Sequence, residues 1–137
     1  NYAYVASGFS GLVILDITVP SSPILAGAYA TTGFANGVTV SGNYAYVADD
    51  GKAILDGSSG LVIIDISDPS SPSLTGTYDF IYAYSSVISG NYAYVADYNG
   101  LVILDVSDPS VPVLAGKYPS NGDSNCVAVS GNYAYFS

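Results

Sequence analysis

Carboxylates are the main side chains in this sequence that could act in acid–base catalysis or bind a metal ion. Its 137 residues include eleven acids, all of them Asp, against two lysines and no histidine, and the net charge is −9 at pH 7. Arginine, glutamate and tryptophan are absent as well. Without imidazole, most general bases, metal–imidazole sites and Ser-His or Cys-His nucleophiles are excluded. The sequence therefore predicts a protein that is not an enzyme, and a paired-Asp hydrolase is the catalytic arrangement left open.

Three aspartates in one Gly- and Ser-rich stretch have the chemistry of a calcium site. Asp49, Asp50 and Asp56 lie in a predicted loop over 49–60, and carboxylate oxygens are the ligands that calcium prefers. Their spacing differs from that of an EF-hand loop, and Lys52 lies among them. We therefore expect no cofactor and a solvated loop, with calcium at these three residues as the alternative.

Tyrosine is the second residue type that could contact a ligand, and the chain has fourteen tyrosines. Most of them recur at fixed intervals, which favours packing with the hydroxyl group reaching an edge. Tyr82, Tyr84 and Tyr98 fall outside that pattern. These three are predicted to be exposed surface contacts, and a glycan is the ligand considered for them.

The spacing of one phrase indicates how these residues are positioned. Gly-Asn-Tyr-Ala-Tyr occurs at 42–46, 90–94 and 131–135, and a copy without its glycine opens the chain. The asparagines stand at positions 1, 43, 91 and 132, so the steps are 42, 48 and 41 residues. A period near 40 is typical of stacked or radial repeat architectures.

Each repeat is predicted to contain four short β-strands. The run Leu101-Val102-Ile103-Leu104 follows a turn signal at 97–100 and precedes a proline-containing breaker at 108–112. No window has helical spacing together with a helix-forming composition. Because the run is apolar at successive positions, both faces of its sheet must be buried. Sheets packed face to face, as in the blades of a β-propeller, meet this requirement, and a flat solenoid of sheets is the structural alternative.

The recurring aspartates have a structural interpretation. Asp16, Asp65 and Asp105 follow the apolar third strand, where a carboxylate accepts backbone N–H groups of the next turn. Asp68 and Asp108 precede proline and are predicted to cap the breaker in the same way.

The single cysteine is predicted to be structural too. Cys126 occupies the slot held by Gly37 and Ser85 in the other repeats, which favours a small residue in a tight core position. With one cysteine, no internal disulfide is possible.

The complete pattern resembles the LVIVD repeat family. It is carried by Leu-Val-Ile-Ile-Asp at 61–65, the Asp-Pro-Ser-Ser-Pro that follows, and the Gly-Asn-Tyr-Ala-Tyr-Val-Ala that precedes it. The resemblance covers essentially the whole chain. It implies β-propeller-type repeats of surface or secreted proteins in bacteria and archaea, and it supplies no catalytic motif.

We therefore expect one all-β repeat domain over 1–137, with propeller-like blades of four antiparallel strands and about three repeats. With strands A to D in each blade, and A before the tyrosine phrase, the chain reads BCD, ABCD, ABCD, AB. The approximate repeat boundaries are 1–36, 37–84, 85–125 and a partial 126–137.

Three repeats are too few for a ring, because closed propellers have about four to eight blades. The interpretations are an excerpt of a longer propeller, a protomer completed by another chain, or a lone compact unit. Open ends expose apolar faces and unpaired strand edges. The predicted assembly edges are Asn1, Tyr2, Tyr4, Tyr133 and Tyr135.

These observations favour a non-enzymatic, self-assembling structural module, located extracellularly or at the cell surface. Its expected partners are other copies of itself or the rest of a longer repeat chain, and a filament is one form. The alternative is an adhesin or glycan-binding propeller that uses the 49–60 loop and exposed tyrosines. The net charge argues against nucleic acid, and no apolar run of 18 residues predicts a membrane span.

Overall fold

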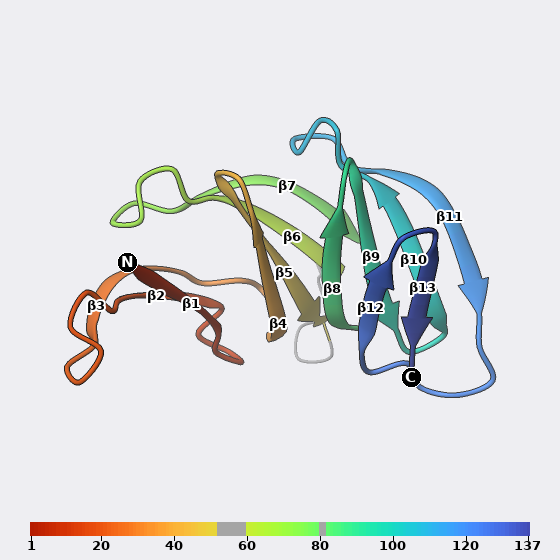
Figure 1. The fold of residues 1–137 in the computed structure, drawn as a ribbon, viewed down its shortest axis with the longest axis horizontal. Helices are drawn as coiled ribbons and strands as arrows, with labels where there is room; N and C mark the ends of the chain where they lie inside the picture. Colours follow the sequence, from red (N-terminus) through yellow and green to blue (C-terminus); the bar gives the residue numbers. More distant parts are fainter. Residues whose placement is uncertain (52–59, 80–81) are drawn as a thin grey trace.

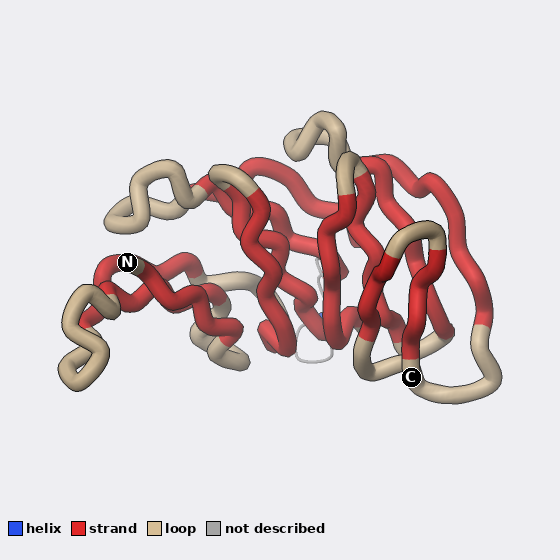
Figure 2. Tube along the Cα trace, in the orientation of Figure 1, coloured by secondary structure: helices blue, strands red, loops and turns tan. Residues whose placement is uncertain are grey.

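The computed structural model describes residues 1–51, 60–79 and 82–137, and β-strands are the regular elements of this part of the chain (Figures 1 and 2). No helix suited to crossing a membrane occurs among these residues. The strands are β1 (Tyr2–Ala6), β2 (Leu12–Asp16), β3 (Ile24–Tyr29), β4 (Phe34–Ser41), β5 (Tyr44–Asp50), β6 (Gly60–Asp65), β7 (Ser73–Asp79), β8 (Ala83–Ser89), β9 (Tyr92–Asp97), β10 (Gly100–Asp105), β11 (Val113–Pro119), β12 (Val127–Ser130) and β13 (Tyr133–Phe136).

The strands form four antiparallel sheets in chain order, which we call blades 1 to 4. Their strand orders are β1-β2-β3, β4-β5-β6-β7, β11-β10-β9-β8 and β12-β13. This is the predicted pattern BCD, ABCD, ABCD, AB, and the all-β fold with four-stranded propeller-like blades is confirmed. β4 begins at Phe34 and β8 at Ala83, whereas the predicted repeat boundaries lie at 37 and 85.

In blades 2 to 4, a glycine forms the turn of the first hairpin. Ser41 pairs with Tyr44, so Gly42 and Asn43 alone connect β4 to β5. Gly42 has a φ of 58°, and Gly90 and Gly131 have nearly the same value at the equivalent turns. Glycine with positive φ at the first central position is what a type II′ hairpin turn requires. The repeated phrase therefore begins at a turn that joins strands A and B.

The blades are arranged as a fan rather than a closed ring (Figure 1). The inner strands of neighbouring blades approach one another, since β4 contacts β8, and β8 contacts β12. The fourth strands lie on the outside, and β11 is exposed along most of its length. This convergence of inner strands is the geometry of consecutive propeller blades.

The core is divided among the three junctions between blades. Each junction has its own cluster of buried apolar residues. The buried residues between blades 1 and 2 are Leu12, Ile14, Ala35, Ala45, Val47, Val62, Ile64 and Ile66. Those between blades 2 and 3 are Tyr46, Ala48, Leu61, Ile63, Ala83, Ala93, Val95, Leu104 and Val106. Those between blades 3 and 4 are Ala96, Leu101 and Val127.

These clusters give each blade two unlike faces. Tyr46 pairs with Ile63 on what we call the forward face, and Val47 pairs with Val62 on the back face. In every junction the forward face of one blade packs on the back face of the next. The stacking is therefore directional, and the same contact recurs along the array.

The close approach of neighbouring blades is also evident at a glycine in the fourth strand. A Cβ atom on Gly27 of blade 1 would run into the carbonyl oxygen of Pro69, in the turn of blade 2 that follows strand C. Gly76 of blade 2 stands in the same relation to Pro109 of blade 3. Gly116, the equivalent in blade 3, has open space instead. The slot requires glycine where the corresponding turn of a following blade is present.

The prediction for Cys126 is wrong. Its side chain is exposed, not held in a tight core position. Cys126 precedes β12 in blade 4, and no further blade covers that part of the array among the described residues. The equivalent residues Gly37 and Ser85 are half-buried, so this slot is more covered inside the fan than at its end.

Candidate functional site

The two ends of the fan present uncovered apolar faces. At one end is the back face of blade 1, where Val5 pairs with Val13 and Ala3 pairs with Leu15. Val5 is 39% exposed, whereas its equivalent in blade 2, Val47, is fully buried under blade 1. The residues of this end therefore have the apolar character of an internal junction without its cover.

The other end is the forward face of blade 4. Tyr133 and Tyr135 lie on it, and Tyr135 is 60% exposed. Tyr46, which holds the same slot in blade 2, is 4% exposed because it packs in the cluster against blade 3. The forward face of blade 4 and the back face of blade 1 are therefore the two kinds of surface that pack together at each internal junction.

The predicted assembly edges are partly at these ends. β1 and β13 are the outermost strands of their sheets, so each has one edge without a partner in the described part of the chain. Asn1 and Tyr2 are exposed, whereas Tyr4 is half-buried against the cluster between blades 1 and 2. Tyr4 therefore contributes to an internal junction.

The recurring aspartates of the turns are structural, as predicted. Each accepts a hydrogen bond from the N–H two residues further on. The donors are Thr18 to Asp16, Ser67 to Asp65 and Ser107 to Asp105, at 2.8, 2.8 and 2.9 Å. The hydroxyl group and then the backbone N–H of the donor residue hold the pKa of each carboxyl below its usual value. Asp68 and Asp108 accept from Ser70 and Ser110 in the same manner.

Buried aspartates also occur where strand B ends. Asp49 is fully buried and lies next to Gly33, which belongs to the connection between blades 1 and 2. Asp97 has the equivalent position in blade 3 and is also buried. Burial raises the pKa of both carboxyls, which outweighs the lowering by nearby hydrogen-bond donors. These two acids differ from those of the turns in both solvation and the sign of their shift.

Two of the three candidate calcium ligands, Asp49 and Asp50, are buried at the end of β5. Asp49 is buried within the junction, Asp50 follows it at the end of β5, and Asp56 lies outside the described residues. Within the described ranges, no group of three or more His, Cys, Asp or Glu residues is placed to hold a metal ion.

The off-pattern tyrosines come together in part. The rings of Tyr82 and Tyr98 are 5.4 Å apart between centroids, and Tyr98 is 46% exposed. Tyr84 is half-buried, and burial followed by the charge of Asp50 raises the pKa of its hydroxyl. The structure therefore presents a pair of aromatic rings beside the turn from β9 to β10.

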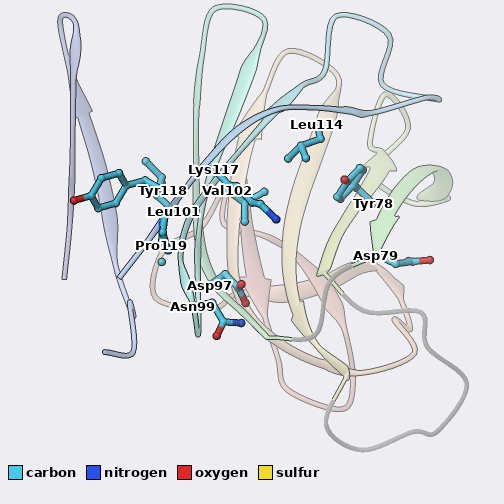
Figure 3. A pocket seen from close by; sticks show the side chains of 11 residues that line it. Tyr78, Asp79, Asp97, Asn99, Leu101, Val102, Leu114, Lys117, Tyr118 and Pro119 are labelled. Atoms are coloured by element: carbon cyan, nitrogen blue, oxygen red, sulfur yellow. The ribbon is translucent and has the colours of Figure 1, made fainter. Parts of the chain in front are cut away.

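Sequence reasoning missed a cavity whose lining includes residues of the turn from β9 to β10. It has a volume of about 320 Å³ and lies between β7 of blade 2 and the outer strands of blade 3 (Figure 3). Tyr78 stands on one side, and Val102, Leu114 and Lys117 stand on the other, with Asp97 near one end. The available signal was Lys117, one of two lysines in the chain.

The described residues define a class of fold: an array of propeller-like blades that these residues do not close into a ring. The family model of the LVIVD repeat matches residues 1–31, 32–80, 82–120 and 121–137, so this chain belongs to the LVIVD repeat family. The resemblance noted from the sequence is thereby confirmed. A search of curated proteins found no match.

Proposed function

We propose that this protein is a non-enzymatic structural module that assembles with copies of itself through the two end faces of the fan. The observation that carries the proposal is the directional stacking of the blades. Three junctions within the chain place a forward face on a back face. The uncovered forward face of blade 4 and back face of blade 1 would form a fourth junction of the same kind between two copies.

The symmetry of such a contact favours rings or filaments. A head-to-tail contact uses two different surfaces of the same molecule, and repeating it either closes a ring or extends without end. Burial of apolar surface stabilises the contact by about 25 cal/mol per Å². The unpaired edges of β1 and β13 add hydrogen-bonding groups that strands of another copy can satisfy.

An extracellular or cell-surface location belongs to the same proposal. It is supported by the Asp-rich composition, the two lysines and the single cysteine. The lack of histidine and arginine supports a structural rather than a catalytic role. The recurring aspartates Asp16, Asp65 and Asp105 each accept a hydrogen bond within a turn, which is a structural role.

Sedimentation velocity and negative-stain electron microscopy of the 137-residue chain test the proposal. We expect concentration-dependent assemblies, seen as rings or filaments. A uniform monomer of 14.0 kDa at every concentration would contradict self-assembly. That result is expected if further repeats of a longer polypeptide normally cover the two end faces of the fan.

A pair of matched variants localises the contact. Val5→Asp places a charge on the back face of blade 1, and Val111→Asp places the same charge on an exposed turn of blade 3, away from both end faces. Val5→Asp is expected to weaken assembly strongly, because the carboxylate loses its water at the contact. Equal weakening by Val111→Asp would show that added negative charge, and not the end face, controls assembly.

Glycan binding is a second candidate function. It is favoured by the contact between the exposed ring of Tyr98 and the half-buried ring of Tyr82, because an aromatic ring provides apolar area with a polar tip. The 49–60 loop of this hypothesis lies mostly outside the described residues.

A further inference from the structure

We propose that the cavity between β7 and blade 3 binds one neutral sugar ring, with Lys117 and Asp97 as its polar contacts and Tyr78 as its aromatic wall. This inference deepens the glycan-binding function and rests on it, whereas it does not depend on self-assembly. Tyr98, whose ring contacts that of Tyr82, belongs to the turn that also supplies Asp97 and Asn99 to the lining of the cavity.

The cavity combines apolar walls with polar groups. The ring of Tyr78 lies across from Val102 and Leu114, and the amino group of Lys117 extends into the space between them (Figure 3). Asp97 and Asn99 lie together at one end of the lining. A volume of about 320 Å³ is at the lower end of the range of roughly 300–1,000 Å³ for ligand pockets, so it suits a single ring.

Asp97 lines one end of the cavity and is 7% exposed. Its Oδ1 atom is enclosed and has no hydrogen-bond partner among the described residues, and the same is true of both carboxylate oxygens of Asp49 in blade 2. A buried polar atom without a partner is costly unless water or a ligand supplies one. We place the ligand hydroxyl group against the part of Asp97 that borders the cavity.

The charges define the ligand class. Lys117 donates hydrogen bonds, whereas Asp79 and Asp97 accept them, so a ligand with both donors and acceptors fits the lining. The two carboxylates and the net charge of −9 disfavour an anion, and the lysine disfavours a cation. A sugar ring has hydroxyl groups at its rim and C–H groups on its face, which pack on an aromatic ring.

The neighbouring junction provides an internal comparison. A cavity of about 260 Å³ lies at the equivalent place between blades 1 and 2, where Tyr29 replaces Tyr78 and Thr77 replaces Lys117. No buried carboxylate is part of its lining. The repeat therefore creates the groove and the buried aspartate, and Lys117 is the substitution in blade 3 that adds a charged donor to the lining.

Saturation-transfer difference NMR on the full chain tests the inference, because the method tolerates large assemblies. The probes are the methyl glycosides of glucose, galactose and mannose, with N-acetylneuraminic acid as an anionic comparison. We expect saturable binding of at least one neutral glycoside, with a Kd on the order of 1 mM for a single ring. The anionic sugar is expected to bind more weakly.

Two variants and a matched control locate the site. Lys117→Thr introduces the residue that blade 2 has in this slot, and Asp97→Asn removes the charge with little change in shape. Each is expected to weaken binding about tenfold through the loss of a charged hydrogen bond. Asp108→Asn removes the same charge in a turn outside the cavity and should leave binding unchanged.

The outcomes separate the inference from its premise. Saturable binding that Lys117→Thr and Asp97→Asn leave unchanged would overturn the cavity as the site while retaining glycan binding. No saturable signal from any neutral glycoside at ten times the expected Kd would overturn both. Tighter binding of the anionic sugar would overturn the neutral ligand class.

Discussion

Blade 2 and blade 4 carry the same tyrosine phrase in opposite surroundings. Tyr46 in blade 2 is 4% exposed, whereas Tyr135 in the same slot of blade 4 is 60% exposed. Blade 2 has a neighbour on each face, and the forward face of blade 4 has none in the described part of the chain. Burial in this protein therefore depends on a blade's place in the array as well as on its sequence.

The largest expected effect is the difference between two alanine substitutions in this slot. Tyr46→Ala should lower the free energy of unfolding by about 3–5 kcal/mol, because it removes a large buried side chain from a packed junction. Tyr135→Ala should change it by about 0.5 kcal/mol or less in the monomer, because the side chain is mostly in water. Urea unfolding at low protein concentration measures both, and equal losses would contradict the comparison.

The fourth-strand glycines extend the comparison to the backbone. Gly76→Ala is expected to destabilise the fold by about 1–3 kcal/mol, because its Cβ atom meets the Pro109 carbonyl of the next blade. Gly116→Ala should be neutral or stabilising by about 0.5–1 kcal/mol, because its slot is open and glycine weakens a strand interior. Thermal unfolding of the two variants measures the difference. A loss of stability in Gly116→Ala as large as in Gly76→Ala would show that the strand itself, rather than the neighbouring blade, requires glycine.

We expect substitutions of the hairpin glycines to change the free energy of unfolding by the same amount in each blade. Gly42→Ala and Gly131→Ala are each expected to cost about 1 kcal/mol, because a residue with a Cβ atom is strained at positive φ. Nothing lies near either Cβ position, so no packing term enters. Asparagine at the same positions is the control and should cost less, since it tolerates this conformation better. Unequal costs in urea unfolding would show that even this local turn depends on neighbouring blades.

The smallest effect concerns the pH dependence of stability. Burial raises the pKa of Asp49 in the folded chain. The contribution of Asp49 to the free energy of unfolding therefore falls as pH rises above 3.8, the ordinary pKa of this group. The pKa of Asp65 is lowered, so its contribution is present above that value and is lost as pH falls. Relative to the unmodified chain, Asp49→Asn should gain stability as pH rises from about 3 to 7, and Asp65→Asn should lose it. Unfolding measured across this range tests the signs, and slopes of the same sign would refute the assignment.

Much of the fold was predictable because its signals are local. Apolar runs such as Leu61–Ile64 identify strands buried on both faces, and the glycine turns and proline breakers separate them. The turn role of Asp65 was also predictable, since its hydrogen-bond donor lies two residues away. Strand order followed from counting these elements along the repeats.

The candidate sites were less predictable because they depend on residues far apart in the sequence. The cavity brings Tyr78 of blade 2 to Lys117 of blade 3, and these residues belong to different repeats. Cys126 was expected to be enclosed because Gly37 and Ser85 suggested a tight slot, yet it is exposed. Tyr82 and Tyr98 were set apart because they fall outside the repeated slots, but the contact between their rings joins residues 16 positions apart and was not predicted.

By itself, the sequence determined the repeat, the four-strand unit and the roles of the residues in its turns, because these properties depend on neighbours along the chain. The tertiary structure decided which copies of a residue are buried, which carboxylates lose their water and where a groove forms. The physical reason is that blades stack in one direction, so identical residues meet a neighbour in the middle of the fan and solvent at its ends.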